Sequence, residues 1–187
     1  GTANFVYDLQ EDSGSTATNI SANLLDADGS ESLSYRIEGI ATGLILTAGG
    51  NNVSNGQVLS SSQIASLTIA ETENLSGQFF FNAVAVAKEN STGDTQELVQ
   101  QITVNIAPVA DAPSVSTFNV NMLEDEKVDL STFINGSLAD NDGSETLEYE
   151  LGVPTGWKVT DQDGNEVGLQ SPGVYRVTDE HVQRLDL

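Results

Sequence analysis

One short acidic stretch occurs twice in this chain, and it constrains the fold more than any other feature. It reads Asp26-Ala27-Asp28-Gly29-Ser30-Glu31 and returns as Asp140-Asn141-Asp142-Gly143-Ser144-Glu145. The copies begin 114 residues apart, which fits one compact domain with its connector and exceeds the period of a solenoid repeat. The repeat therefore predicts two similar domains in tandem.

The residues around the two copies also match. Glu11-Asp12 precedes the first copy as Glu124-Asp125 precedes the second. A leucine and a tyrosine follow each copy at the same distances: Leu33 and Tyr35, Leu147 and Tyr149. Because a chance match does not extend this far, we interpret the copies as true repeats.

The acidic charge of the chain limits the kinds of binding partner that we expect. The 187 residues are 38% hydrophobic, enough for one or two cores, but they carry 28 Asp and Glu against 6 Lys and Arg. Nucleic acid and anionic membranes require basic patches and are therefore not expected as partners. Clustered acids repel one another in a compact fold, so cations are the expected counterpart. The sequence has no cysteine for a disulfide or a thiolate metal site, and no apolar run long enough to insert into a membrane.

Hydrophobic alternation predicts an all-β fold. β-rich runs are separated by Gly, Asn, Asp and Ser clusters, as is typical of a sandwich. The strongest alternation lies in residues 78–88 and 97–107, which we expect to form a long antiparallel pair joined by residues 89–94. Shorter strands are expected at residues 4–9, 17–24, 32–38, 44–47, 57–59 and 67–69, with a helical turn at 61–66.

Two prolines mark the boundary between the domains. Pro108 and Pro113 forbid regular strand pairing and favour an extended connector. We expect a first β-sandwich at residues 1–109, a linker at 110–113 and a second β-sandwich at 114–187. The second restarts with a strand at 115–123, and its residues 185–187 correspond to 67–69 of the first. Counterparts of the two longest strands do not follow, so we expect this domain to be incomplete at its C-terminus, either truncated or split by an insertion.

The chemistry of the repeated loop favours a hard cation. Three carboxylates lie within six residues, and the glycine at the fourth position lets the turn fold them inward. Ca²⁺ takes six to eight oxygen ligands, which such a turn and its neighbours supply. The motif is not an EF-hand, which needs Gly at position 6 and Glu at position 12. The alternative is a solvated Asp-Gly turn, and the matched second copy weighs against it.

Strand direction locates the predicted Ca²⁺ site. Antiparallel strands alternate between the two poles of a sandwich, so each acidic loop should occupy the pole that faces the preceding domain. Asp111 would then lie between the second loop and the base of the first domain, where Glu71 and Glu73 are also expected. The predicted metal ligands of the chain are Glu11, Asp12, Asp26, Asp28, Glu31, Asp111, Glu124, Asp125, Asp140, Asp142 and Glu145.

Several short motifs in this order resemble one protein family. They are Glu11-Asp12, the loop 26–31, Ser76-Gly77-Gln78-Phe79, the junction 109–113, Glu124-Asp125 and the loop 140–145. With them the chain resembles the tandem immunoglobulin-like or cadherin-like extender repeats of giant bacterial RTX adhesins. The resemblance covers the first domain and the second as far as it goes, although residues 157–175 are unlike residues 44–59. In such adhesins ligand-binding modules can be inserted into a split repeat.

The resemblance implies an extracellular, structural role. Ca²⁺ at the linkers would stiffen neighbouring repeats of the chain, and the parent adhesin would project a ligand-binding tip from a bacterial surface in adhesion or biofilm formation. The target, a host or surface ligand, would bind elsewhere in the parent protein. The alternative is a Ca²⁺-dependent module that binds carbohydrate or peptide, for which only Trp157 and Tyr175 are candidate contacts.

Other candidate sites have a simpler interpretation. Residues 161–166 contain a third Asp-x-Asp-Gly, more typical of a hairpin turn than of a cation loop. His181 is the single histidine and lacks a serine or acid motif that would make it catalytic. Glu71 and Glu73 are paired carboxylates, but glycoside hydrolysis needs two acids across a cleft. We therefore expect no enzyme activity.

Overall fold

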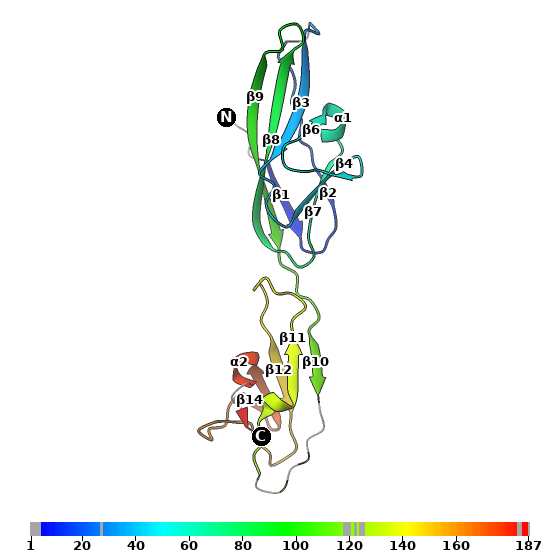
Figure 1. Cartoon of the computed structure of the whole chain (residues 1–187). Helices are drawn as coiled ribbons and strands as arrows, with labels where there is room; N and C mark the ends of the chain where they lie inside the picture. Colours follow the sequence, from blue (N-terminus) through cyan, green and yellow to red (C-terminus); the bar gives the residue numbers. More distant parts are fainter. Residues whose placement is uncertain are drawn as a thin grey trace. The chain divides into compact units, whose positions relative to one another are not determined.

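The computed structural model describes residues 5–26, 28–117, 121, 123, 126–182 and 185–186, and its regular secondary structure is nearly all β. The chain divides into two compact units, Gly1–Val109 and Ala110–Leu187, and each is described by itself (Figure 1). The predicted all-β class is confirmed.

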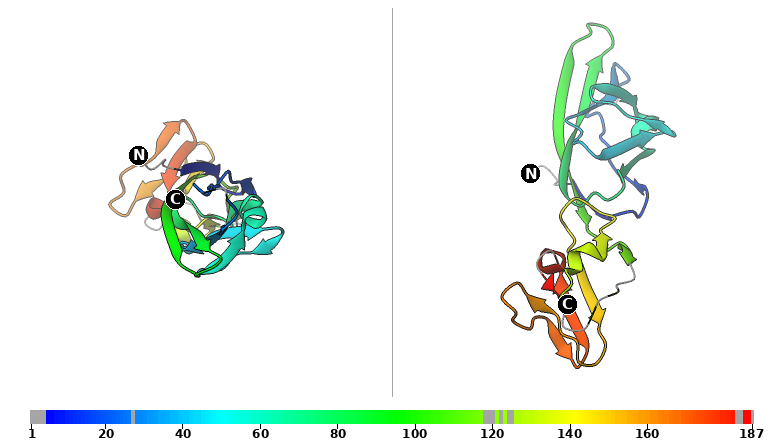
Figure 2. Two further views of the ribbon diagram at one scale, coloured as in Figure 1. Left: turned by 90° about the horizontal axis from the view of Figure 1, so that it is seen from above. Right: turned by 60° about the horizontal axis from the view of Figure 1, so that its bottom comes forward.

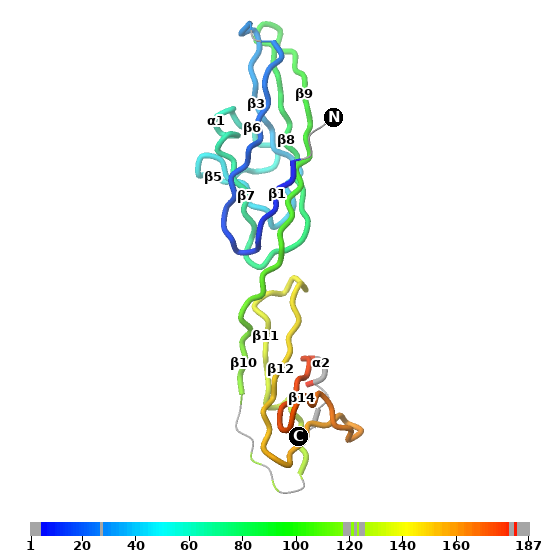
Figure 3. The backbone as a smooth tube through the Cα atoms, turned by 180° about the vertical axis from the view of Figure 1, so that it is seen from behind, coloured from blue at the N-terminus to red at the C-terminus, as the bar shows by residue number. Residues whose placement is uncertain are grey.

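Unit 1 contains two sheets. The five-stranded sheet has the order β1 (Phe5–Gln10), β9 (Thr95–Ala107), β8 (Gly77–Glu89), β3 (Glu31–Glu38), β6 (Gln57–Ser60). The four-stranded sheet has the order β2 (Thr16–Ala17), β7 (Leu67–Glu71), β4 (Leu44–Ala48), β5 (Asn51–Asn52). All neighbours pair antiparallel except β1, which runs parallel to β9 and lies beside it in Figure 3.

One hydrophobic core lies between these sheets. Tyr35, Phe81 and Ile102 enter it from the larger sheet, and Leu46 and Ile69 enter it from the smaller one. All five belong to strands in which alternate residues are buried, as the period of two requires. Unit 1 is therefore a β-sandwich-like structure.

The long hairpin was predictable and is present. β8 and β9 pair from Gly77 opposite Ile106 to Lys88 opposite Thr95, as the alternation in residues 78–88 and 97–107 predicts. In Figure 2 this hairpin is the longest feature of unit 1, drawn in green. The predicted helical turn is confirmed as α1 (Ser61–Ile64), which Ser60 and Gln63 close with a capping box.

The strand expected at residues 17–24 is wrong for most of its length. Thr16 and Ala17 pair with Ile69 and Thr68, and Thr18 N donates to Leu67 O over 2.9 Å. Beyond them tyrosine hydroxyls take the place of a neighbouring strand: Asn19 N donates to Tyr7 Oη over 3.0 Å, and Ala22 N donates to Tyr35 Oη over 2.9 Å. Side chains thus satisfy backbone groups that a ladder would otherwise satisfy.

Unit 2 contains three small sheets among its described residues. β10 (Ser114–Thr117) pairs with β11 (Ile134–Ser137), and β13 (Thr160–Asp161) pairs with β16 (Leu185–Asp186). The third sheet has the order β12 (Glu148–Gly152), β15 (Val174–Thr178), β14 (Leu169–Ser171). The 3-10 turn η1 (Leu130–Thr132) and the short helix α2 (Asp179–Val182) complete the unit. Of the strand expected at 115–123, the described part is strand only to Thr117.

A smaller core holds unit 2 together. Its buried residues are Leu130, Tyr149, Val159, Tyr175, Val177 and Val182. Tyr149 of β12 occupies the place of Tyr35 in β3, because each tyrosine lies nine residues after the first aspartate of its acidic loop. We infer that β12 is the counterpart of β3, and that the two units repeat one local structure around their loops.

Candidate metal-binding loops

The two acidic loops have the same local geometry. In the first, Asp26 Oδ1 accepts a hydrogen bond from Asp28 N over 3.1 Å, and Asp28 Oδ1 accepts one from Ser30 N over 2.7 Å. In the second, the corresponding distances are 2.8 Å and 2.7 Å. The glycine has a φ of 87° in the first loop and 90° in the second, which a residue with a side chain rarely adopts. The sequence repeat is thus a structural repeat.

The first loop lies beside the β8–β9 turn. Glu31 pairs with Glu89 in the register of β3 and β8, and Asn90 N donates to Ser30 O over 2.9 Å. Hydrogen bonds from Ser30 lower the pKa of Asp28, and hydrogen bonds from Ser91 lower the pKa of Glu89. These acids are therefore ionised at neutral pH. The charge of Asp28 opposes the shift in the pKa of Glu89, and a bound cation would relieve that repulsion.

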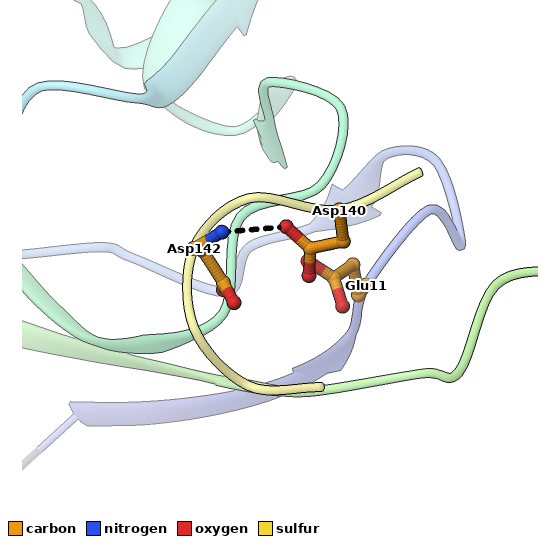
Figure 4. A group of neighbouring side chains, drawn as sticks. All are labelled: Glu11, Asp140 and Asp142. Atoms are coloured by element: carbon orange, nitrogen blue, oxygen red, sulfur yellow. Dashed lines mark hydrogen bonds between the residues drawn. The ribbon is translucent and has the colours of Figure 1, made fainter. Parts of the chain in front are cut away.

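The second loop holds a buried carboxylate. Asp140 is 3% exposed and accepts hydrogen bonds from Asp142 N and from Ser144 Oγ, the latter over 3.0 Å. Figure 4 draws the bond between Asp142 and Asp140. Since burial of a carboxylate costs free energy unless donors or cations compensate it, Asp140 is a candidate metal ligand of this loop.

The linker backbone of unit 2 is bound to the same loop. Asp111 N donates to Glu145 Oε1 over 2.7 Å. The other oxygen, Glu145 Oε2, is buried and has no hydrogen-bond partner among the described residues. An oxygen of this kind is a candidate ligand, because a hard cation supplies the compensation that a missing donor does not.

The other end of the linker is bound to a carboxylate of unit 1. Glu11 is 4% exposed; its N–H donates to Ala107 O over 3.0 Å, and its Oε2 accepts from Val109 N over 3.1 Å. Asp12 follows with a φ of 56°, and its Oδ1 accepts from Asn74 N over 3.4 Å. Glu71 ends β7 and Glu73 follows it, so these acids lie in the same end of the unit as the Asn74 turn.

The structure thus places most of the predicted ligands. Those of the two loops lie in matched turns, Glu11 binds the backbone before the linker with Asp12 next to it in sequence, and Asp111 belongs to the linker itself. Glu124 and Asp125 lie outside the described residues. The grouping of carboxylates from both units around one ion stays a prediction. Sequence analysis missed Glu89 as a ligand candidate, although its position opposite the first loop follows from the predicted hairpin.

Residues 161–166 form a hairpin turn, as predicted. Asp161 Oδ1 accepts hydrogen bonds from Asp163 N and Asn165 N, and Asn165 Nδ2 also donates to this carboxylate. These bonds, chiefly those from Asn165, lower the pKa of Asp161. Three hydrogen-bond donors already contact this carboxylate. It therefore has less free acceptor capacity for a cation than the carboxylates of Asp140 and Glu145 have.

Trp157, Tyr175 and His181 are the remaining candidates. Tyr175 is a core residue, 2% exposed, and donates to Glu166, while Trp157 is 39% exposed. The side chain of His181 is not among those described. None of the helices in the described residues is long and apolar enough to cross a bilayer.

Comparison of the chain with protein-family models, curated proteins and solved structures gives no significant match.

Proposed function

We propose that the chain is a Ca²⁺-stabilised structural segment, built from immunoglobulin-like or cadherin-like units, of an extracellular bacterial adhesin. The observation that carries the proposal is the pair of carboxylates bound to the linker backbone. Glu11 binds Val109 N in unit 1, and Glu145 binds Asp111 N in unit 2, two residues further along the chain. Candidate metal ligands that bind the backbone at both ends of a short connector suit a cation-dependent stiffening mechanism.

The mechanism is charge neutralisation. Without a cation, the clustered carboxylates at each end of the connector repel one another within their own unit, and the connector is free to bend. With Ca²⁺ bound, these carboxylates are neutralised, and the connector backbone that they bind is restrained. Glu145 has both functions, because one oxygen holds the linker backbone and the other is buried without a donor among the described residues.

The adhesin role is the wider part of the proposal. The tandem units, the acidic loops and the Val109–Pro113 junction support it through their resemblance to extender repeats of RTX adhesins. In that role the segment separates a ligand-binding tip from the cell surface and makes no chemical change to a substrate.

Thermal unfolding and small-angle X-ray scattering with Ca²⁺ and with a chelator test the mechanism. A ligand that binds only the folded state stabilises it by about 2.7 kcal/mol at 100 times Kd. For a domain of this size, each kcal/mol raises Tm by roughly 4–8 °C. We expect Ca²⁺ to raise Tm and the maximum dimension together. The mechanism is wrong if the chelator changes neither.

Two variants and a matched control assign the ligands. Asp111→Asn and Asp142→Asn should each lower the Ca²⁺-dependent rise in Tm and the calorimetric stoichiometry or affinity. Asp163→Asn removes one exposed charge of the same kind from the hairpin turn and should leave both unchanged. Equal losses in all three variants would mean diffuse screening in place of a defined site.

A further inference from the structure

A groove occurs at the same place in both units. In unit 1 it has a volume of about 450 Å³, and in unit 2 it has a volume of about 540 Å³. Five lining positions of one groove lie 114 residues from five of the other: Ala22, Asn23, Leu24, Glu31 and Leu33 against Gly136, Ser137, Leu138, Glu145 and Leu147. The two grooves are therefore equivalent positions of the repeat, and the residues that line them can be compared.

The difference between the grooves is one wall. In unit 1 strands β8 and β9 supply Ala85, Ala87 and Leu98. In unit 2 no counterpart of these strands lines the groove among the described residues, and the remaining lining residues include Thr178 and Asp179. β3 pairs with β6 on one edge and β8 on the other, whereas β12 pairs in the described part of unit 2 with β15 alone.

The backbone of β12 is poised to pair on its open edge. Val153 N donates to Gly173 O, and Asp179 N donates to Leu147 O, so the odd-numbered residues 147–153 direct their backbone groups to β15. In an antiparallel ladder these groups alternate. The N–H and C=O groups of Glu148, Glu150 and Gly152 consequently face the open edge, as a template for another strand.

We propose that this edge of β12 is a docking site for the first strand of a β-hairpin whose inward side chains are small and apolar. The register of unit 1 specifies that strand. Ala87, Ala85 and Ala83 of β8 lie opposite Leu33, Tyr35 and Ile37 of β3. The counterparts in unit 2 are Leu147, Tyr149 and Leu151, and a larger residue opposite Tyr149 would meet its ring. The inference goes beyond the proposed function and does not depend on Ca²⁺.

The outward side chains of the docking hairpin have a required charge. In unit 1 Arg36 binds Glu97 of β9 across the intervening strand through two hydrogen bonds of 2.9 Å and 3.0 Å. The position of Arg36 is taken in unit 2 by Glu150, which pairs with Arg176 over 3.3 Å. The second strand of the hairpin should therefore carry a basic residue where β9 carries Glu97.

The test uses the full chain with a second copy of residues 70–107 joined after Leu187. This copy carries Glu97→Arg, and the join preserves the spacing that follows β7 in unit 1. Backbone amide hydrogen exchange is then measured by NMR. Without the added hairpin, the amides of Glu148, Glu150 and Gly152 should exchange faster than those of Tyr149 and Leu151. With it, they should slow by about tenfold or more, and the alternation along β12 should vanish.

Two matched controls separate pairing from general stabilisation. Glu150→Pro removes an edge N–H that β15 does not use and should abolish the protection, whereas Glu150→Gln keeps the N–H and should retain it. Ala85→Lys in the added copy should also abolish it. Persistent alternation with the added hairpin would overturn the proposal. A dimer of the unmodified chain that Glu150→Pro dissociates would assign the edge to a second copy and also overturn it.

Discussion

At the scale of single residues, one tyrosine in each unit fixes the segment that leads to the acidic loop. Tyr35 Oη accepts from Ala22 N and donates to Ala22 O over 3.2 Å. Tyr149 Oη donates to Asp179 Oδ1 over 2.7 Å and lies so close to Gly136 that a Cβ there would be 2.6 Å from it. The alanine of unit 1 is thus replaced by glycine where the second tyrosine approaches more closely.

Gly136→Ala should therefore destabilise unit 2. The added methyl group would also lie 3.0 Å from Leu147, and overpacking of this kind costs about 1–3 kcal/mol. Gly152→Ala is the matched control, since its Cβ would meet nothing within 4 Å. Chemical denaturation of both variants decides the matter. A cost for Gly152→Ala as large as for Gly136→Ala would contradict the steric argument.

Acid should weaken the bond between Arg36 and Glu97. The hydrogen bond from Arg36 lowers the pKa of Glu97, so the folded state releases the proton more readily than the unfolded state. The stabilisation is complete above the unfolded pKa, near 4.3, and is lost as pH falls through the lower folded value. Glu97→Gln should flatten this acid limb of the unfolding curve. Identical limbs in both proteins would show that the pair contributes nothing measurable.

At the scale of secondary structure, a segment could be predicted when its backbone hydrogen bonds belong to a regular strand ladder. It could not be predicted when distant residues make those bonds. β8 and β9 were predictable because their ladders follow a period of two that is visible in the sequence. Residues 19–22 were not, because the hydroxyls of Tyr7 and Tyr35 bind the backbone there, and such contacts between distant residues leave no periodic signal. The parallel pairing of β1 with β9 is equally non-local.

In the candidate site, too, the local turns could be predicted from the sequence and the contacts between distant segments could not. The turns of both acidic loops are local, and the Asp-x-Asp-Gly-Ser spacing is sufficient to predict them. The bonds from Val109 to Glu11 and from Asp111 to Glu145 depend on how strands bring distant segments together. The sequence predicts Glu11 and Glu145 as ligands but does not predict that their carboxylates accept hydrogen bonds from the linker backbone.

The sheets of the two units also differ in how much core they enclose. Among the described residues, the core of unit 1 has 17 buried hydrophobic residues and that of unit 2 has 6. Since burial of apolar surface is the main stabilising term, unit 2 should be the less stable unit. The strand that docks on β12 would supply the side chains that β8 supplies in unit 1, so docking and stability of unit 2 are linked.

At the scale of the whole molecule, the formal net charge of −22 makes any cation stabilising to some degree. General screening depends on ionic strength, and the Debye length falls from about 10 Å at 0.1 M to about 3 Å at 1 M. A defined site instead depends on the identity of the ion. Ca²⁺ accepts irregular arrangements of six to eight oxygens, whereas Mg²⁺ demands an octahedron and releases water reluctantly.

The two mechanisms predict different series of melting temperatures. At equal ionic strength, a defined site should give a larger rise in Tm with CaCl₂ than with MgCl₂, and the smallest rise with NaCl. Glu145→Gln should reduce the rise in Tm with Ca²⁺ and leave the rise with NaCl intact. The substitution replaces the buried carboxylate oxygen by an amide nitrogen and leaves most of the total charge unchanged. Equal rises in Tm from all three salts, or an equal loss of all three rises in the variant, would show that cations stabilise the chain only by nonspecific screening of its acidic residues. The repeated loops would then be surface turns with no preferred ion.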